Sequence, residues 1–120
     1  MRVLVTGASS RLLGGVASAL ARRGDEVVCL QRRSVVGGVA AGLEPGQVDE
    51  VLGDVRDATV VDRAVAGCDA VIHGAARVGV VGTWDDYRSV NVDGTANLLD
   101  AARRHGVARF VHVSSPSVAH

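Results

Sequence analysis

The residues best suited to chemistry lie near the start of the chain, where a run of Val and Leu ends at Thr6-Gly7 and a loop of small residues follows. Glycine permits a tight turn directly after a strand, and small side chains let backbone N–H groups approach a phosphate. A helix-periodic segment over residues 12–23 comes next, and the amino end of a helix attracts anions. This order predicts a site for the pyrophosphate of a dinucleotide, against the alternative of an ordinary strand-to-helix turn.

A second candidate group follows the second predicted strand. Sites that select NAD usually carry Asp or Glu at the end of that strand, where this chain has Gln31 followed by Arg32 and Arg33. Two guanidinium groups suit bidentate contact with a phosphate, so we expect them to hold the 2′-phosphate of NADP and favour NADP over NAD. The alternative is that both arginines are solvated loop charges.

Hydrophobic patterning predicts the elements that position these residues. Apolar runs typical of buried parallel strands occupy residues 2–6, 26–30, 48–52, 70–73 and 107–113. Helical patterns occupy residues 12–23, 58–66 (with Asp57 as the N-cap) and 84–105. Strands that alternate with helices form a parallel sheet with right-handed crossovers. The sequence therefore predicts an α/β fold, a Rossmann-type doubly wound sheet of five parallel strands in the order 3-2-1-4-5, as a single domain over residues 1–120.

Composition excludes several classes of function. The formal net charge is zero, which argues against a nucleic-acid partner. The four histidines lack the spacing of metal ligands, and we expect each, including His73, to be a core or surface residue. We expect Cys29 and Cys68 to be buried thiols. Reduced thiols and the lack of a secretory or membrane-spanning segment predict a cytoplasmic chain with no membrane partner.

Five segments, taken together, resemble the motifs of one family. They are residues 3–9 (Val-Leu-Val-Thr-Gly-Ala-Ser), 53–57 (Gly-Asp-Val-Arg-Asp), 71–76 (Val-Ile-His-Gly-Ala-Ala), 91–95 (Asn-Val-Asp-Gly-Thr) and 110–115 (Phe-Val-His-Val-Ser-Ser). In this order they resemble the TGxxGxxG, GDxxD, VxHxAA, NVxGT and strand-five serine motifs of the extended short-chain dehydrogenases/reductases. This group includes NAD(P)-dependent epimerases/dehydratases and 3β-hydroxysteroid dehydrogenase/isomerase-like enzymes.

The resemblance implies a role for each matching residue. Around the pyrophosphate it places Gly7, Ser9, Ser10, Arg11, Leu12 and Gly14. On the adenine side, Asp54 would accept from the amino group and Val55 would lie beside the ring; the alternative for Asp54 is a turn residue. On the nicotinamide-ribose side it places Ala75 and Ala76, and it adds Ser114 to the cofactor-binding residues. Asn91, also among these, would hold the loop after the fourth strand and a helix irregularity, and Ser115 would be the substrate-facing catalytic hydroxyl.

The chain departs from the family pattern at three positions in these motifs. Ser10 and Leu13 stand where the fingerprint has glycines, so the glycine loop is one residue longer and continues to Gly14. Gly74 stands where a larger apolar residue is usual.

The family catalyses with a Tyr-x-x-x-Lys pair on the helix after strand five, in which Lys lowers a tyrosine pKa that is ordinarily about 10. All 13 basic residues here are arginines, and Asn91 follows four residues after Tyr87, the single tyrosine. We therefore expect a truncated chain that lacks the catalytic helix and substrate domain and that self-associates, or pairs with another polypeptide, through an exposed strand five. We expect it to be inactive alone and to act on a small-molecule substrate only if another chain supplies the Tyr and Lys.

Two functions remain open. The first is the NAD(P)-binding portion of an oxidoreductase/epimerase that acts on a secondary alcohol or carbonyl, such as a sugar or sterol. The second is a non-catalytic dinucleotide-binding or vestigial module.

Overall fold

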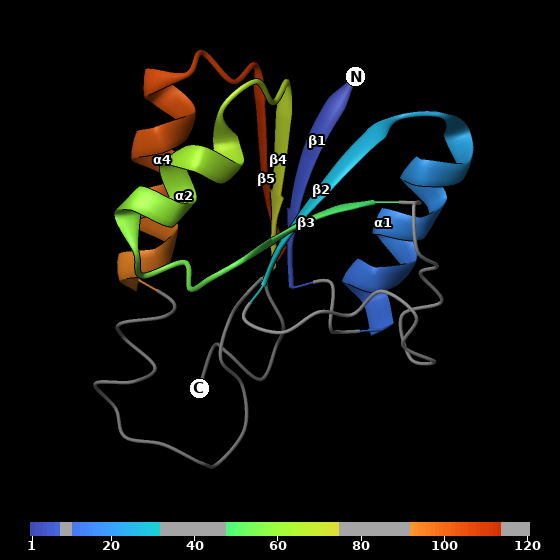
Figure 1. The fold of residues 1–120 in the computed structure, drawn as a ribbon, viewed down its shortest axis with the longest axis horizontal. Coiled ribbons are helices and arrows are strands. Elements are labelled where there is room, and N and C mark those ends of the chain that lie inside the picture. Colours follow the sequence, from blue (N-terminus) through green and yellow to red (C-terminus); the bar gives the residue numbers. More distant parts are fainter. Residues whose placement is uncertain (8–10, 32–47, 75–91, 114–120) are drawn as a thin grey trace.

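The protein is represented by a computed structural model that describes residues 1–7, 11–31, 48–74 and 92–113 (Figure 1). Its five strands are β1 (Arg2–Thr6), β2 (Glu26–Gln31), β3 (Asp49–Leu52), β4 (Ala70–His73) and β5 (Arg109–His112). All pairings between them are parallel, and the strand order is β3-β2-β1-β4-β5. The predicted Rossmann-type sheet is confirmed.

Helices cover both faces of this sheet. They are α1 (Arg11–Arg23), α2 (Ala58–Val65) and α4 (Gly94–Arg104). Figure 1 shows α1 against one face and α2 with α4 against the other. The predicted N-cap is confirmed, because the Asp57 side chain accepts from the backbone N–H groups that open α2. Of the expected long helix over residues 84–105, the structure describes one π-helical turn at Val92–Asp93 followed by α4.

The core lies in two apolar layers, one on each side of the sheet. On the α1 side, Val3, Val5, Val27 and Cys29 pack with Leu13 and Ala17. On the other side, Leu4, Val28, Leu30 and Val71 pack with Val61 and Leu98. Successive residues of a strand face opposite layers, so strands covered on both sides are apolar nearly throughout, as the sequence pattern indicated.

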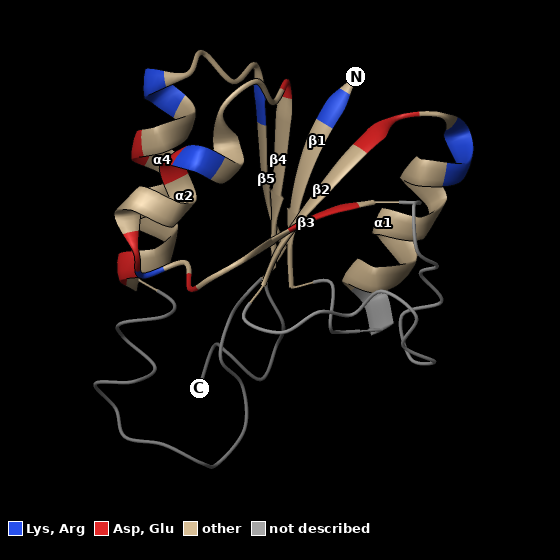
Figure 2. Cartoon of the chain, viewed as in Figure 1, with Lys and Arg blue, Asp and Glu red and all other residues tan. Residues whose placement is uncertain are grey.

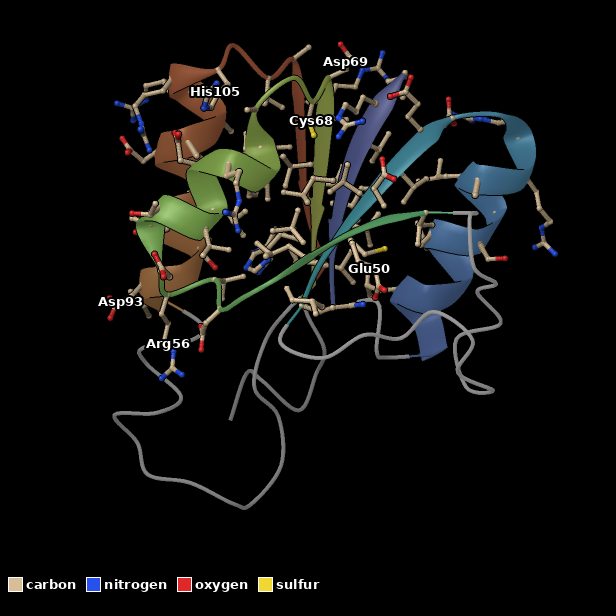
Figure 3. All side chains as sticks on the ribbon, in the orientation of Figure 1. Glu50, Arg56, Cys68, Asp69, Asp93 and His105 are labelled. Atoms are coloured by element: carbon tan, nitrogen blue, oxygen red, sulfur yellow. The ribbon has the colours of Figure 1, made fainter. Side chains whose placement is uncertain are left out.

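Charged residues of both signs gather at the amino ends of the strands (Figure 2). The Arg2 guanidinium lies 2.9 Å from Glu26 on β2 and 3.8 Å from Asp49 on β3. The Arg2 backbone N–H donates to the Asp69 carboxylate at 2.8 Å, and Figure 3 labels Asp69 beside the amino end of β4. These contacts connect the amino end of β1 to the amino ends of β2, β3 and β4. They lie at the edge of the sheet opposite the glycine turn.

No helix in the described ranges is long and apolar enough to cross a membrane.

Candidate dinucleotide site

The glycine turn leaves the sheet at the carboxyl end of β1. Gly7 has φ 80°, in the left-handed region that glycine adopts without steric cost. The chain then enters α1 at Arg11. Because β2 lies on one side of β1 and β4 on the other, the strand order reverses here. In open α/β sheets, ligands bind in the crevice at this switch point.

A hydrogen-bonded network of side chains lies at the carboxyl ends of β1 and β4, beside this switch point. Thr6 Oγ1 lies 2.7 Å from His73 Nδ1, and His73 Nε2 lies 2.9 Å from Thr95 Oγ1. The Gly74 backbone N–H donates to Thr6 Oγ1 at 2.9 Å. This network of hydrogen bonds therefore connects the carboxyl ends of β1 and β4 to the first turn of α4.

The His73 side chain in this hydrogen-bond network is neutral. It is 1% exposed, and its ring stacks on His112 with the ring centres 5.2 Å apart. Burial, and secondarily the charge of His112, lower the pKa of His73 to about 4. At neutral pH the ring therefore positions two hydroxyl groups, and the expectation of a core histidine is confirmed. Within the described ranges, no three His, Cys, Asp or Glu residues form a group that could hold a metal ion.

Two of the three departures from the family pattern meet in this structure. Leu13, in the first turns of α1, is 4% exposed. A Cβ atom on Gly74 would lie 2.8 Å from Leu13 Cγ and 2.9 Å from its Cδ2. The absence of a side chain at Gly74 therefore makes the space that Leu13 fills between α1 and the end of β4.

On the predicted adenine side, Asp54 is held by a neighbour that the sequence analysis did not identify. Arg56 Nη2 donates to Asp54 Oδ2 at 2.6 Å and Arg56 Nε donates to Oδ1 at 3.0 Å. The Arg56 backbone N–H also donates to Oδ1, at 2.9 Å. Figure 3 shows Arg56 at the lower end of the α2 and α4 layer. These bonds fix the carboxylate at the start of the turn that leads into α2.

The first turns of α4 support the same loop from behind. A Cβ atom on Gly94 would lie 2.5 Å from Val55 Cγ2, so glycine allows the helix to approach this closely. Asn97 Nδ2 donates to the Val55 carbonyl at 3.0 Å. The sequence analysis named Val55 but missed Asn97, whose only signal is its place two residues after the Asn-Val-Asp-Gly-Thr segment.

Gln31, the last residue of β2, has an unusual environment. It is 8% exposed, and its Nε2 donates to Glu50 Oε2 on β3 at 2.8 Å. Its Oε1 atom is buried and has no hydrogen-bond partner in the described part of the chain. The Gln31 backbone carbonyl accepts from Gly53 N at 2.9 Å.

The remaining predicted site residues divide into two sets. The structure describes Gly7, Gly14 (buried within α1), Asp54 and Val55, together with the helical backbone of Arg11 and Leu12. Outside the described ranges lie Ser9, Ser10, Arg32, Arg33, Ala75, Ala76, Asn91, Ser114 and Ser115.

Comparison with known proteins gives the family. The chain is 38% identical over 120 residues to 2-alkyl-3-oxoalkanoate reductase of Stenotrophomonas maltophilia, covering 100% of this chain and 35% of that protein. It is 40% identical over 126 residues to 3 beta-hydroxysteroid dehydrogenase/Delta 5-->4-isomerase of Mycobacterium tuberculosis, covering 98% of this chain and 32% of that protein. The chain thus spans about a third of the length of these relatives.

A solved structure shows the same fold. A mutant of uronate dehydrogenase from Agrobacterium tumefaciens, complexed with NAD, superposes with a TM-score of 0.77 at 31% identity, over 95% of this chain and 40% of that one. The model of the NAD dependent epimerase/dehydratase family matches residues 3–119. The chain belongs to the NAD dependent epimerase/dehydratase family.

Proposed function

We propose that these residues form the NAD(P)-binding portion of an oxidoreductase or epimerase that acts on a secondary alcohol or carbonyl. The observation that carries the proposal is Gly7, whose left-handed φ of 80° turns the chain from β1 toward the amino end of α1 at the switch point of the sheet. Backbone N–H groups at such a turn, together with the helix dipole, favour a pyrophosphate. The NAD complex of the related uronate dehydrogenase supports the same cofactor class.

The described residues fit a nicotinamide dinucleotide at its adenosine end. Asp54 offers carboxylate oxygens to an adenine amino group, and Val55 is held beside it by Asn97. The buried Oε1 of Gln31, which has no hydrogen-bond partner among the described residues, lies at the end of β2, where a dinucleotide site receives the ribose. A nicotinamide dinucleotide, when bound, supplies or accepts the hydride of the reaction. By the family resemblance, we assign Ala75 and Ala76 to the nicotinamide-ribose side, Ser114 to the cofactor site and Ser115 to the substrate oxygen, with Asn91 holding the loop after β4.

NADP is the proposed preference, because Arg32 and Arg33 follow a neutral Gln31. The test is calorimetric titration of the purified chain with NADPH and NADH. We expect tighter binding of NADPH and loss of the difference in an Arg32→Ala, Arg33→Ala double variant. Arg63→Ala, an exposed change on α2, is the matched control. Equal affinities in the original chain would refute the preference, and absence of binding by a folded chain would refute the whole assignment.

The proposed substrate class rests on the names of the relatives, a reductase of oxoalkanoates and a hydroxysteroid dehydrogenase. A Tyr-x-x-x-Lys pair cannot lie within residues 1–120, since these contain no Lys. We therefore propose that the 120 residues alone bind the cofactor without transferring hydride. Reduction of NADP⁺ by the purified chain in the presence of a panel of secondary alcohols would refute this, whereas binding without turnover also accommodates the non-catalytic alternative.

Two further proposals concern partners and location. Among the described residues β5 pairs with β4 alone, and three of its four residues are exposed, so we propose self-association through this edge. Sedimentation velocity over a concentration series tests it, with Val111→Lys expected to shift the chain to the monomer. Cys29 and Cys68 are free and buried, which supports a cytoplasmic location.

A further inference from the structure

We infer that two copies of this chain join through β5, which pairs with its own copy as antiparallel strands about a two-fold axis at Val111. The inference rests on the self-association proposed above and adds to it the symmetry, the register and the residues that meet. The partner is a second copy of this chain. The product is one continuous sheet, made of the five described strands of each copy.

The backbone of β5 decides which residues can pair outward. The Val113 N–H donates to the His73 carbonyl on β4 at 2.9 Å, so the backbone groups of Val113 face β4. These groups alternate along a strand, so those of Val111 also face β4 and those of Phe110 and His112 face away from the sheet. In the described ranges, no hydrogen bond joins the outward groups to another element. They form the edge that a further strand can occupy.

The outward groups select one antiparallel register. A hydrogen-bonded antiparallel pair exchanges both N–H···O=C bonds between two residues whose backbone groups face each other. When Phe110 of each copy lies opposite His112 of the other, both outward residues of each β5 take part. Registers that place Phe110 opposite Phe110, or His112 opposite His112, use only one outward residue of each strand. The first register therefore satisfies more backbone groups, and it puts Val111 on the two-fold axis, opposite its own copy.

The side chains on both faces of β5 suit this register. Val111 is 50% exposed, and by alternation it shares the α1 side of the sheet with Val113, which packs with Ile72 against the apolar layer there. At the axis the two Val111 side chains cover each other as a β-branched pair. On the other face Phe110, which packs against the second apolar layer, meets the exposed His112 of the other copy. Each face of the joint thus pairs apolar or aromatic groups.

The position of Arg109 also permits a second copy. This arginine is exposed at the amino end of β5. In the inferred register it lies opposite Val113 of the other copy, and the two Arg109 residues are separated by roughly 13 Å along the strands. That distance exceeds the screening length of about 8 Å at physiological ionic strength, so their repulsion is weak. Because the strands run antiparallel, the two proposed dinucleotide sites lie at opposite ends of the joint sheet.

The first experiment is cross-linking of Val111→Cys. In an antiparallel pair without hydrogen bonds the Cα atoms lie about 4.5 Å apart, within reach of a disulfide. Mild oxidation of the folded variant should therefore give a covalent dimer on denaturing electrophoresis without reductant. Arg109→Cys is the matched control on the same face, because its copy lies roughly 13 Å away. The original chain controls for Cys29 and Cys68, which are free and buried.

The second experiment places charges at the axis and serves if the cysteine variants fail to fold. Val111→Lys and Val111→Glu each put like charges opposite one another, so each variant alone should sediment as a monomer. An equimolar mixture of the two should sediment as a dimer, because opposite charges then meet. This rescue requires that residue 111 faces its own copy, and mixing would not repair a merely structural defect.

Sedimentation velocity of the original chain separates this inference from the proposal on which it rests. A dimer whose Val111→Cys variant cross-links and whose Arg109→Cys variant does not supports the inference. A dimer in which both cysteine variants cross-link equally, or in which the mixed charge variants stay monomeric, overturns the register and leaves self-association standing. A chain that is monomeric over the whole concentration series overturns both, while the titration with NADPH and NADH tests the dinucleotide site independently.

Discussion

Leu13 Cγ lies 2.8 Å from the position that a Cβ atom on residue 74 would take, so the side chain at residue 13 and the missing side chain at Gly74 are complementary. In the sequence these are two separate departures from the family pattern, one in the glycine loop and one after the fourth strand. In the structure the Leu13 side chain of α1 occupies the space that a side chain on residue 74, at the end of β4, would take. The departures therefore leave the helix packed against the sheet, with Leu13 buried.

This contact predicts strong energetic coupling between the two positions. Gly74→Ala should lower the free energy of unfolding by about 1–3 kcal/mol through overpacking, and Leu13→Ala by about 2–5 kcal/mol through the cavity that it leaves. The double variant should lose at least about 0.5 kcal/mol less than the sum, because each change relieves the other. Urea unfolding of the four proteins measures this, and strict additivity would contradict the contact.

Gly94 offers a second test of close packing. A side chain there would meet Val55 Cγ2 at 2.5 Å, so Gly94→Ala should destabilise the protein by about 1–3 kcal/mol. Under the adenine-side role proposed for Asp54, it should also weaken dinucleotide binding by displacing the loop that carries this residue. Gly15→Ala is the matched control, since nothing lies within 4 Å of its added Cβ atom. That change within α1 should raise stability by about 0.5–1 kcal/mol. Thermal unfolding compares the two, and similar shifts would argue against the close approach.

The buried His73 ring predicts a dependence of stability on pH. Its pKa is lowered from 6.5 to about 4, so between these values the unfolded chain binds a proton that the folded chain does not. The contribution of His73 is thus complete above pH 6.5 and is lost as the pH falls toward 4, by about 3 kcal/mol in all. His73→Gln should flatten the stability curve in that range, measured by denaturant titration at several pH values. His105→Gln is the control, and an equal flattening there would assign the effect elsewhere.

The N-cap of α2 predicts that replacing Asp57 lowers the free energy of unfolding more than replacing Asp93 does. Asp57 Oδ1 accepts from Thr59 N at 3.0 Å and from Val60 N at 3.3 Å, so Asp57→Ala should cost about 1 kcal/mol. Asp93 holds the corresponding position before α4 without a side-chain capping bond, and Asp93→Ala should cost less than about 0.5 kcal/mol. Chemical denaturation of both variants decides the point; a larger loss in Asp93→Ala would be inconsistent with these caps.

Structural features that depend on residues close together in the sequence could be predicted from the sequence alone. β1 and β4 have the predicted bounds, and Asp57 caps α2 as expected, because apolar runs and capping residues act within a few positions. β5 covers residues 109–112, shorter than the predicted 107–113, because its length depends on pairing with β4. Such pairing is not encoded in a local pattern.

The candidate site was predictable only in part for the same reason. Gly7 and Val55 could be named from motifs, but the bonds from Gln31 to Glu50 and from His73 to Thr95 join residues that are 19 and 22 positions apart. Sequence alone indicated Gln31 as a position for cofactor choice and gave no sign that Glu50 holds it. Only the register between β2 and β3 brings these two side chains together.

The ion pairs at the amino ends of the strands have a practical consequence. Arg2 connects β1 to Glu26 and Asp49 at the edge opposite Gly7, and Met1 beside it is exposed. A fluorophore, an affinity tag or a surface linker attached at the amino terminus would therefore stand away from the carboxyl ends of the strands, where the dinucleotide site is proposed. The chain can be immobilised by that end for ligand screening with the carboxyl ends of the strands facing the solution.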